Sequence, residues 1–274
     1  MYNKYVVNRE TDARVRLAQM PSIHQKTDRI QRIIARIIAT NPAGVNLLLI
    51  GGFRFRLLDR SQRFSADIDY HWGADLDIKM REILELSRRV VLREVRSQLG
   101  YQGSANVRRG PDADSPHARF VDLRFWKGQT SIEVPVEITR IPCSDPPIIR
   151  TADGTVHATA SDADMIESKL IAVLGRLFVE HRDLVDIFLY GEKLRPDSGA
   201  RLKQKIEQLS LGSSTILRRL KDLEENREFH MVAVQRVIDG QMDPDAAQQM
   251  NAGGGGQAVF DFAMGILRRN IPQS

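Results

Sequence analysis

Apolar positions along the chain follow a strand pattern in much of the first half and a helical pattern in the second half. Isoleucines recur at helical spacing from position 30 to position 37, which predicts an amphipathic helix from Ser22 to about position 41. We expect a short apolar strand, a glycine pair, a short helix and a second strand next, at residues 47–50, 51–52, 53–58 and 67–72. The first helix should pack on the sheet that these strands begin.

A longer helix and three strands complete the first half. Apolar spacing predicts the helix at 77–99, with Gly100 as its C-terminal cap. Alternation predicts strands at 104–108, 119–126 and 131–138, with Lys127-Gly128 as the turn between the last two and a loop at 110–116. Because Pro135 has no backbone N–H, the third strand should lie at a sheet edge or carry a bulge. We expect a connector at 142–160 with a short strand at 156–158.

From Ser161 onward the pattern is helical. It predicts helices at 165–178, 181–190, 198–209, 213–239 and 257–269. The glycine run at 252–256 predicts a flexible linker before the last helix. The change of pattern predicts two domains, an α/β mixed-sheet domain at 1–160 and a helical domain at 161–274. The first 21 residues are predicted to form a loose arm with a short helix at 10–19.

Asp67 and Asp69 are two positions apart on the second strand, so their side chains should point to the same face. Carboxylates that close raise each other's pKa unless a cation lies between them. Mg2+ is the expected cation because it prefers carboxylate, water and phosphate oxygens. The preceding Gly51-Gly52 suits a phosphate, because glycine lets backbone N–H groups approach an anion at a helix start. The pattern predicts metal-assisted phosphoryl or nucleotidyl transfer, and the alternative is a solvated Asp-x-Asp strand.

Two further acids, Glu133 and Glu137, alternate with apolar residues on the strand at 131–138. Either one would complete a three-carboxylate site if its side chain pointed to the same side as Asp67 and Asp69. The competing interpretation is an ordinary half-exposed strand with its acids in solvent.

The composition is that of a soluble globular protein, with 42% apolar and 27% charged residues. The chain has no run of eighteen apolar residues and no secretory signal at its start, so we expect a cytoplasmic protein without a membrane partner. The single cysteine, Cys143, excludes an internal disulfide and a multi-cysteine zinc site. A net charge of +5 and several arginine clusters suit a phosphate-bearing partner, and solvated helix faces explain the clusters equally well.

Three motifs resemble those of a known family. The glycine pair followed by Arg63-Phe-Ser-Ala-Asp-Ile-Asp69 resembles the nucleotidyltransferase superfamily, and most closely the AbiEii/AbiGii-type toxins of bacterial toxin–antitoxin and phage-defence systems. Residues 167–176 are similar to that family's Lys-Leu-x-Ala-Leu-x-x-Arg motif, and residues 182–186 to its Arg-Asp-x-x-Asp motif. The resemblance spans residues 45–190. The chain departs from it at Gly52, where the superfamily often has serine, and at Val173, where the family has leucine.

The resemblance implies a nucleotidyltransferase fold and a set of site residues. It implies a third acid on a later strand, a role that we assign to Glu137. The expected metal ligands are Asp67, Asp69 and Glu137. The expected catalytic residues are Asp67, Asp69, Glu137, Lys169 and Asp183. The expected nucleotide-binding residues are Gly51, Gly52, Ser65, Lys169, Arg176, Arg182 and Asp186. Taken alone, Arg182 and Asp186 are also explained as a surface ion pair one helical turn apart.

The resemblance also implies a reaction. The enzyme would bind a nucleoside triphosphate (NTP) with one or two Mg2+ or Mn2+ ions, transfer the nucleoside monophosphate and release pyrophosphate. The implied acceptor is RNA, with tRNA 3′ ends favoured, so growth would stop because aminoacylation is blocked. A cognate antitoxin protein would neutralise the toxin. The alternatives are transfer to a small molecule or a protein hydroxyl, and a silent nucleotide- or nucleic-acid-binding module; the presence of Asp67, Asp69 and a third acid favours catalysis.

Overall fold

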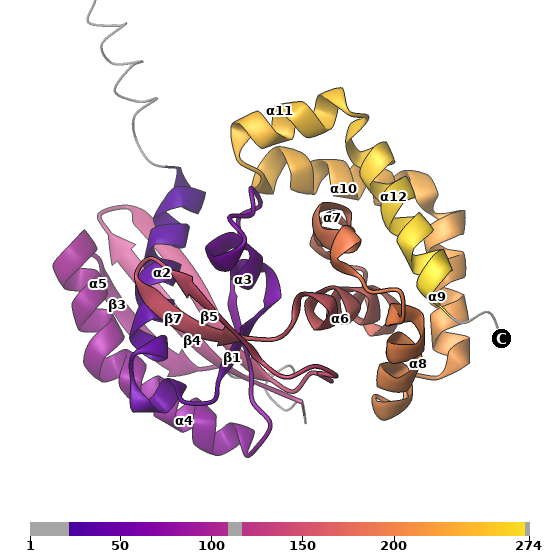
Figure 1. Ribbon diagram of the computed structural model, residues 1–274. Coiled ribbons are helices and arrows are strands. Elements are labelled where there is room, and N and C mark those ends of the chain that lie inside the picture. Colours follow the sequence, from indigo (N-terminus) through magenta and orange to yellow (C-terminus); the bar gives the residue numbers. More distant parts are fainter. Residues whose placement is uncertain (1–21, 109–116, 272–274) are drawn as a thin grey trace, which may run out of the picture.

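The computed structural model describes residues 22–108 and 117–271. The helix expected at 10–19 and the loop expected at 110–116 lie outside these ranges. Figure 1 shows a sheet with its covering helices, coloured indigo to pink, beside a cluster of helices coloured orange to yellow. This arrangement confirms the predicted fold class, a mixed α/β sheet followed by helices. Within the described ranges, no helix is long and apolar enough to cross a membrane.

Seven strands form one mixed sheet in the order β3-β4-β5-β2-β1-β7-β6. Strand β1 pairs antiparallel with β2 and parallel with β7, while β2 pairs parallel with β5. The strands span Leu48–Ile50 (β1), Ile68–His71 (β2), Gln102–Val107 (β3), Ala118–Lys127 (β4), Thr130–Thr139 (β5), Ile148–Ala152 (β6) and Thr155–Thr159 (β7). The two strands that flank the glycine pair are therefore short and lie in the middle of the sheet.

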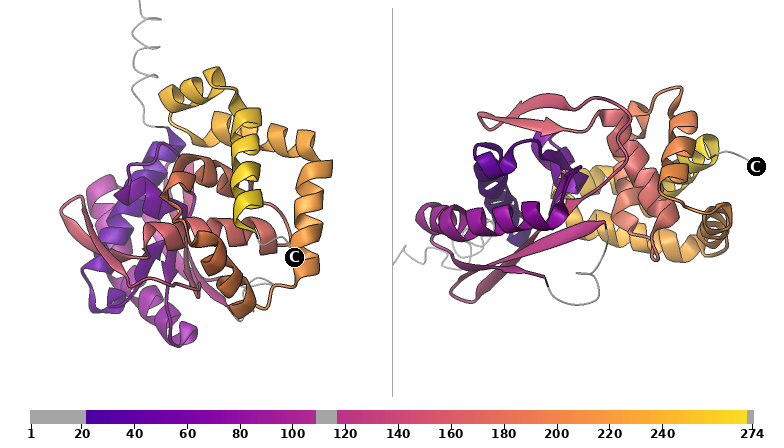
Figure 2. Two further views of the ribbon diagram at one scale, coloured as in Figure 1. Left: turned by 45° about the vertical axis from the view of Figure 1, so that its right-hand side comes forward. Right: turned by 90° about the horizontal axis from the view of Figure 1, so that it is seen from below.

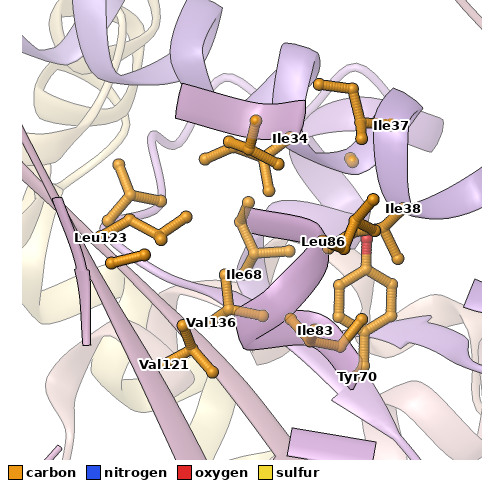
Figure 3. Close-up of a cluster of buried hydrophobic side chains, with 14 of the residues drawn as sticks. Ile34, Ile37, Ile38, Ile68, Tyr70, Ile83, Leu86, Val121, Leu123 and Val136 are labelled. Carbon is orange, nitrogen blue, oxygen red and sulfur yellow. The ribbon is translucent and has the colours of Figure 1, made fainter. Parts of the chain in front are cut away.

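Helices α2 (Ile23–Ala39), α4 (Leu76–Leu86) and α5 (Leu92–Leu99) pack against the sheet. Ser22 begins α2 in a capping box with Gln25, as the start signal at Ser22 predicts. A π-helical turn at 87–91 joins α4 to α5, and Gly100 ends α5 with φ of +76°. Ile34 of α2 and Ile83 of α4 lie in one core cluster with Ile68 and Val136 of the strands, seen in Figure 3.

The structure corrects two predictions about the sheet. The connector contains two strands, β6 and β7, joined by a turn in which Asp153 and Gly154 both have positive φ. Pro135 is not on an edge strand, because β5 lies between β4 and β2. The proline is tolerated there because β2 pairs with β5 only from Val136 onward. Pro135 therefore precedes the part of β5 that has partners on both sides.

The second half of the chain forms a helical cluster with its own apolar core. Its helices are α6 (Asp162–Gly175), α7 (His181–Tyr190), α8 (Ser198–Gln208), α9 (Ser213–Glu225), α10 (Arg227–Gln241), α11 (Pro244–Ala252) and α12 (Gly255–Asn270). The single helix expected at 213–239 is wrong, since the chain breaks at Asn226 between α9 and α10. Helix α11 was not predicted, because its short sequence has no buried residue.

The glycine run is not the predicted flexible linker. Gly254 and Gly255 have positive φ and turn the chain directly from α11 into α12. Gly255 and Gly256 are buried, and a Cβ atom on Gly256 would lie 2.4 Å from the carbonyl oxygen of Met231. The glycines are therefore needed for close helix packing, and α12 docks on α7 and α10 of its own chain.

Backbone contacts join the segment before β2 to the helical cluster. Arg63 forms a β-bridge with Met242, and the N–H of Phe64 donates to the carbonyl of Gln241 at 2.8 Å. Figure 2 shows the two parts of the chain side by side, with the sheet on one side and the helices on the other. The segment that carries Arg63 and Ser65 is thus held between them.

Candidate active site

The chain passes from β1 into helix α3 (Gly51–Leu58) at Gly51, two residues earlier than predicted. Gly51 has φ of +75°, which L side chains rarely adopt. A Cβ atom on Gly51 would lie 1.7 Å from Oδ2 of Asp69, and one on Gly52 would lie 2.4 Å from Nη2 of Arg63. The two glycines therefore allow a carboxylate and a guanidinium to approach the first turn of α3.

Asp69 and Glu137 lie next to each other on neighbouring strands. They occupy paired positions of β2 and β5, which places their side chains on the same face of the sheet. Among the described residues, neither carboxylate has a hydrogen-bond or ion-pair partner. Glu133, the alternative third acid, is 63% exposed and pairs with Arg124 instead. The structure thus brings Glu137, and not Glu133, beside Asp69.

The electrostatics of this pair are unfavourable in the protein alone. Burial raises the pKa of Asp69 well above its ordinary value, and the charges of Asp67 and Glu137 raise it further. Burial also raises the pKa of Glu137, with Asp67 adding to the effect. Two half-buried acids that repel each other, with no ion-pair partner in the part of the chain that the structure describes, favour a bound cation.

Asp67 differs from these two acids because it has partners. Its Oδ1 accepts a hydrogen bond from the hydroxyl of Ser65 at 2.8 Å, and its Oδ2 lies 3.2 Å from Nη2 of Arg182. Burial opposes ionisation of Asp67, but Arg182 and the Ser65 hydroxyl outweigh it and hold the pKa below its ordinary value. Arg182 lies in the first turn of α7, so this ion pair connects the helical cluster to the segment before β2.

The opposite wall of the site comes from α6 and α7. Nζ of Lys169 lies 2.7 Å from Oδ1 of Asp183 and 3.0 Å from Oδ2 of Asp186. Burial opposes the charge of Lys169, and the two aspartates overcome it and raise its pKa. Nη1 of Arg176 donates to the other oxygen of Asp183 at 2.9 Å. Asp183 thus holds two cations, Lys169 and Arg176, at the surface of the cleft.

Asp186 lies behind this wall and is fully buried. Nε and Nη2 of Arg63 donate to its two oxygens at 2.7 and 2.8 Å. Asp186 therefore pairs with Arg63 and Lys169, and Arg182 pairs with Asp67, so the interpretation of Arg182 and Asp186 as one surface pair is wrong.

These side chains line one cleft between the sheet and the helices. The predicted residues on its walls are Gly51, Gly52, Ser65, Asp67, Asp69, Glu137, Lys169, Arg176, Arg182 and Asp183. Arg63 and Arg140 also line the cleft and were not assigned a role from the sequence. Arg63 is the first residue of the motif that ends at Asp69, and this position was the signal that could have indicated its buried ion pair with Asp186. Arg140 directly follows the strand of Glu137, but nothing in its own pattern distinguishes it from a surface arginine.

The acids of this cleft suit a divalent cation that also binds substrate. Within the described part of the chain, no three His, Cys, Asp or Glu side chains converge into a complete metal site. Mg2+ commonly takes only one or two carboxylates and completes its shell with water and substrate phosphate. The unpartnered carboxylates of Asp69 and Glu137, with Asp67 nearby, fit that requirement.

Comparison with known families decides the class of protein. A family model described as the nucleotidyl transferase AbiEii toxin of type IV toxin–antitoxin systems matches residues 32–253, which include every site residue described above. The chain belongs to the AbiEii family of nucleotidyltransferase toxins. The resemblance inferred from the three motifs is thereby confirmed. Membership of the AbiEii family makes the protein a nucleotidyltransferase and implies an NTP substrate and a cognate antitoxin.

Solved structures share this AbiEii-family fold. MenT4, a nucleotidyltransferase toxin from Mycobacterium tuberculosis H37Rv, has a TM-score of 0.54 at 17% identity, covering 95% of this chain and 89% of that chain. JHP933 from Helicobacter pylori has a TM-score of 0.51 at 16% identity, covering 92% and 96%. At these identities the likeness concerns the fold. A search of curated proteins finds no match.

Proposed function

We propose that this AbiEii-family enzyme transfers a nucleoside monophosphate from an NTP to the 3′-hydroxyl of RNA, with tRNA as the favoured acceptor, in a Mg2+-dependent reaction. The observation that carries the proposal is the pairing of Asp69 with Glu137, neither of which has a partner among the described residues, beside Gly51 and across the cleft from Lys169 and Arg176. This arrangement sets acids opposite cations, as transfer between a hydroxyl and a triphosphate requires.

In the proposed reaction, the acceptor oxygen forms a bond to the α-phosphorus while the bond to the bridging oxygen breaks and pyrophosphate leaves. The carboxylate of Glu137 orients the attacking hydroxyl and accepts its proton. Lys169 and Arg176 neutralise phosphate oxygens, and the turn at Gly51 and Gly52 admits the phosphates to the start of α3. Asp69 and Glu137, with Asp67 beside them, would hold Mg2+, which would supply charge neutralisation at the transferred phosphate.

The remaining cleft residues position these groups. Asp183 holds Lys169 and Arg176 in place, and Asp186 supports Lys169 from behind. Arg182 and Ser65 orient Asp67 from two sides. Modification of tRNA 3′ ends would block aminoacylation and stop growth, which is the outcome expected of a toxin that acts in phage defence.

Incubation of the purified protein with Mg2+, total cellular RNA and each of the four α-labelled NTPs tests this proposal. Label in a tRNA-sized band with the native protein, and none with Asp67→Ala/Asp69→Ala, would support it and name the base. Label that resists ribonuclease and follows a protein band would overturn the RNA acceptor in favour of a protein hydroxyl. Absence of transfer to any acceptor with all four NTPs would contradict the proposed reaction.

A further inference from the structure

The row of residues that contains Asp69 and Glu137 continues across the sheet. Glu137 of β5 is paired with Phe120 of β4, and directly opposite residues of antiparallel strands have their side chains on the same face. The burial pattern of β4 supports this orientation, because Val121 and Leu123 are buried in the core while Phe120 and the other residues that alternate with them are partly or fully exposed. The order across the sheet is therefore acid, acid and aromatic ring.

The ring of Phe120 is partly exposed and is held by a cation. The guanidinium of Arg108 lies over it, with Cζ 4.3 Å from the ring centroid. Asp122 fixes that guanidinium, accepting hydrogen bonds from Nη2 at 2.7 Å and from Nε at 3.1 Å. Arg108 thus covers one face of the ring, and the side chain of Phe120 is only partly buried.

Phe120 and Arg108 both lie close to Glu137. The charge of Arg108 acts on Glu137, in addition to the pairing of Glu137 with Phe120. Helices α4 and α5 lie along the opposite, apolar side of β3 and β4, as the right-hand view of Figure 2 shows. Further along the same face, Arg124 is 63% exposed and Trp126 is 38% exposed. The exposed side chains of β4 therefore continue along the face that carries Phe120.

We infer that Phe120, backed by Arg108, is a stacking platform for the terminal base of the acceptor, which makes the acceptor a single-stranded RNA 3′ end. This inference rests on the proposed function, since Glu137 there contacts the attacking hydroxyl. The terminal base belongs to the same nucleotide as this hydroxyl. When the hydroxyl is at Glu137 of β5, the base therefore reaches the neighbouring strand β4, which carries Phe120. Aromatic rings bind exposed bases by stacking in proteins that recognise single strands. Stacking is tolerant of base identity, so Phe120 selects an unpaired end and not a sequence.

The test compares Phe120→Leu, which keeps an apolar side chain but has no π-face, with Phe120→Tyr, which keeps the π-face. Trp126→Leu is the matched control, because Trp126 is an exposed aromatic residue on the same face of β4, about 20 Å further along the strand. Each variant is given Mg2+, the preferred labelled NTP and one of two synthetic single-stranded RNAs. The two RNAs differ only in the last nucleotide, which has a base or is abasic.

Phe120→Leu is expected to raise KM for the RNA with a terminal base about tenfold, while KM for the NTP stays unchanged. The abasic RNA should raise the KM of the native enzyme by a similar factor. Phe120→Leu should raise KM for the abasic RNA little further, because both changes remove the same contact. Phe120→Tyr and Trp126→Leu should behave like the native enzyme on both RNAs. Rescue by tyrosine and non-additivity with the abasic RNA are effects that a purely structural role of Phe120 would not produce.

Two outcomes overturn the inference and are distinguishable. If the native enzyme labels RNA and Phe120→Leu has an unchanged KM, or if its loss multiplies with that of the abasic RNA, the platform is wrong and the proposed reaction stands. If the native enzyme labels neither RNA but labels a protein or a small molecule, the RNA acceptor itself is wrong, and the platform with it.

Discussion

Arg63 and Asp186 form a buried two-pronged ion pair that links the segment before β2 to helix α7, with nitrogen–oxygen distances of 2.7 and 2.8 Å. Burial opposes ionisation of Asp186, and Arg63 and Lys169 outweigh it to hold its pKa below the ordinary value. Arg63 also contacts Gly52, so the pair connects the glycine turn to the wall that carries Lys169. The relative placement of the two catalytic walls depends on it.

Removing one partner of this pair should destabilise the fold strongly. Arg63→Met leaves Asp186 buried with only Lys169 as a cation, and the expected loss in free energy of unfolding is about 3–5 kcal/mol. Urea denaturation measures this loss. Arg124→Met is the control, since Arg124 and Glu133 are both 63% exposed and such a pair contributes at most about 1 kcal/mol. Equal losses in the two variants would contradict the structural role of Arg63.

Gly51→Ala should lower the rate of nucleotidyl transfer strongly in a folded protein. Alanine is strained at φ of +75°, and its Cβ would displace the carboxylate of Asp69. A displacement of about 1 Å in a catalytic group can cost about 100-fold in rate. Gly73→Ala serves as the control because nothing lies within 4 Å of the position its Cβ would take. Transfer assays compare the rates of the two variants with that of the native protein. Full activity of Gly51→Ala would show that the glycine turn does not shape the site.

Replacing Glu137 or Glu133 of β5 with glutamine should have different effects on the transfer rate. Glu137→Gln removes the proposed proton acceptor and should lower the transfer rate at least about 100-fold. Its thermal stability should stay the same or rise, because a buried, repelled charge is lost. Glu133→Gln loses only an exposed ion pair and should keep full activity. The reverse ranking of activities would assign the third acid to Glu133.

A histidine pair beside the site predicts a loss of stability at acid pH. Nε2 of His181 lies 2.9 Å from Nδ1 of His230, and His230 is buried. Burial lowers the pKa of both rings, so below about pH 6.5 the unfolded chain binds more protons than the folded chain. Stability contributed by the neutral pair is therefore lost as the pH falls through that value.

His230→Phe removes one of these titrating groups and keeps an aromatic ring beside Phe260. The native protein should lose free energy of unfolding relative to this variant between pH 7.5 and pH 5.5, as measured by urea denaturation at each pH. A difference that stays constant, or that changes in favour of the native protein, would show that the pair is not buried in neutral form.

The sequence predicted the elements whose local pattern matches their environment. Helix α2, with its apolar stripe and Ser22 cap, and the strand of Asp69 are in this class. Tertiary contacts decided what the sequence did not predict. A glycine run such as 254–256 is compatible with a flexible linker and with a tight helix connection. The close approach of the Met231 backbone shows that it is a tight connection here.

The site shows the same division between local and long-range information. Strand alternation predicted that Asp67 and Asp69 share a face, but it left Glu133 and Glu137 as alternatives, and the family resemblance selected Glu137. The pairing of Asp186 with Arg63 and of Arg182 with Asp67 was not predicted, because each pair joins residues more than a hundred positions apart in the chain. Phe120 was missed for the same reason, since only the strand pairing places it beside Glu137.

The transfer rate of Asp69→Asn, at saturating NTP and Mg2+ and normalised to folded protein, shows whether this cleft is the active site. Asparagine keeps the shape of Asp69 beside Gly51 but removes the charge that would hold the cation. We predict a loss of at least about 100-fold in labelled product and in released pyrophosphate, with stability equal to or above that of the native protein. Transfer at the native rate by a folded Asp69→Asn would contradict the assignment of this cleft as the active site.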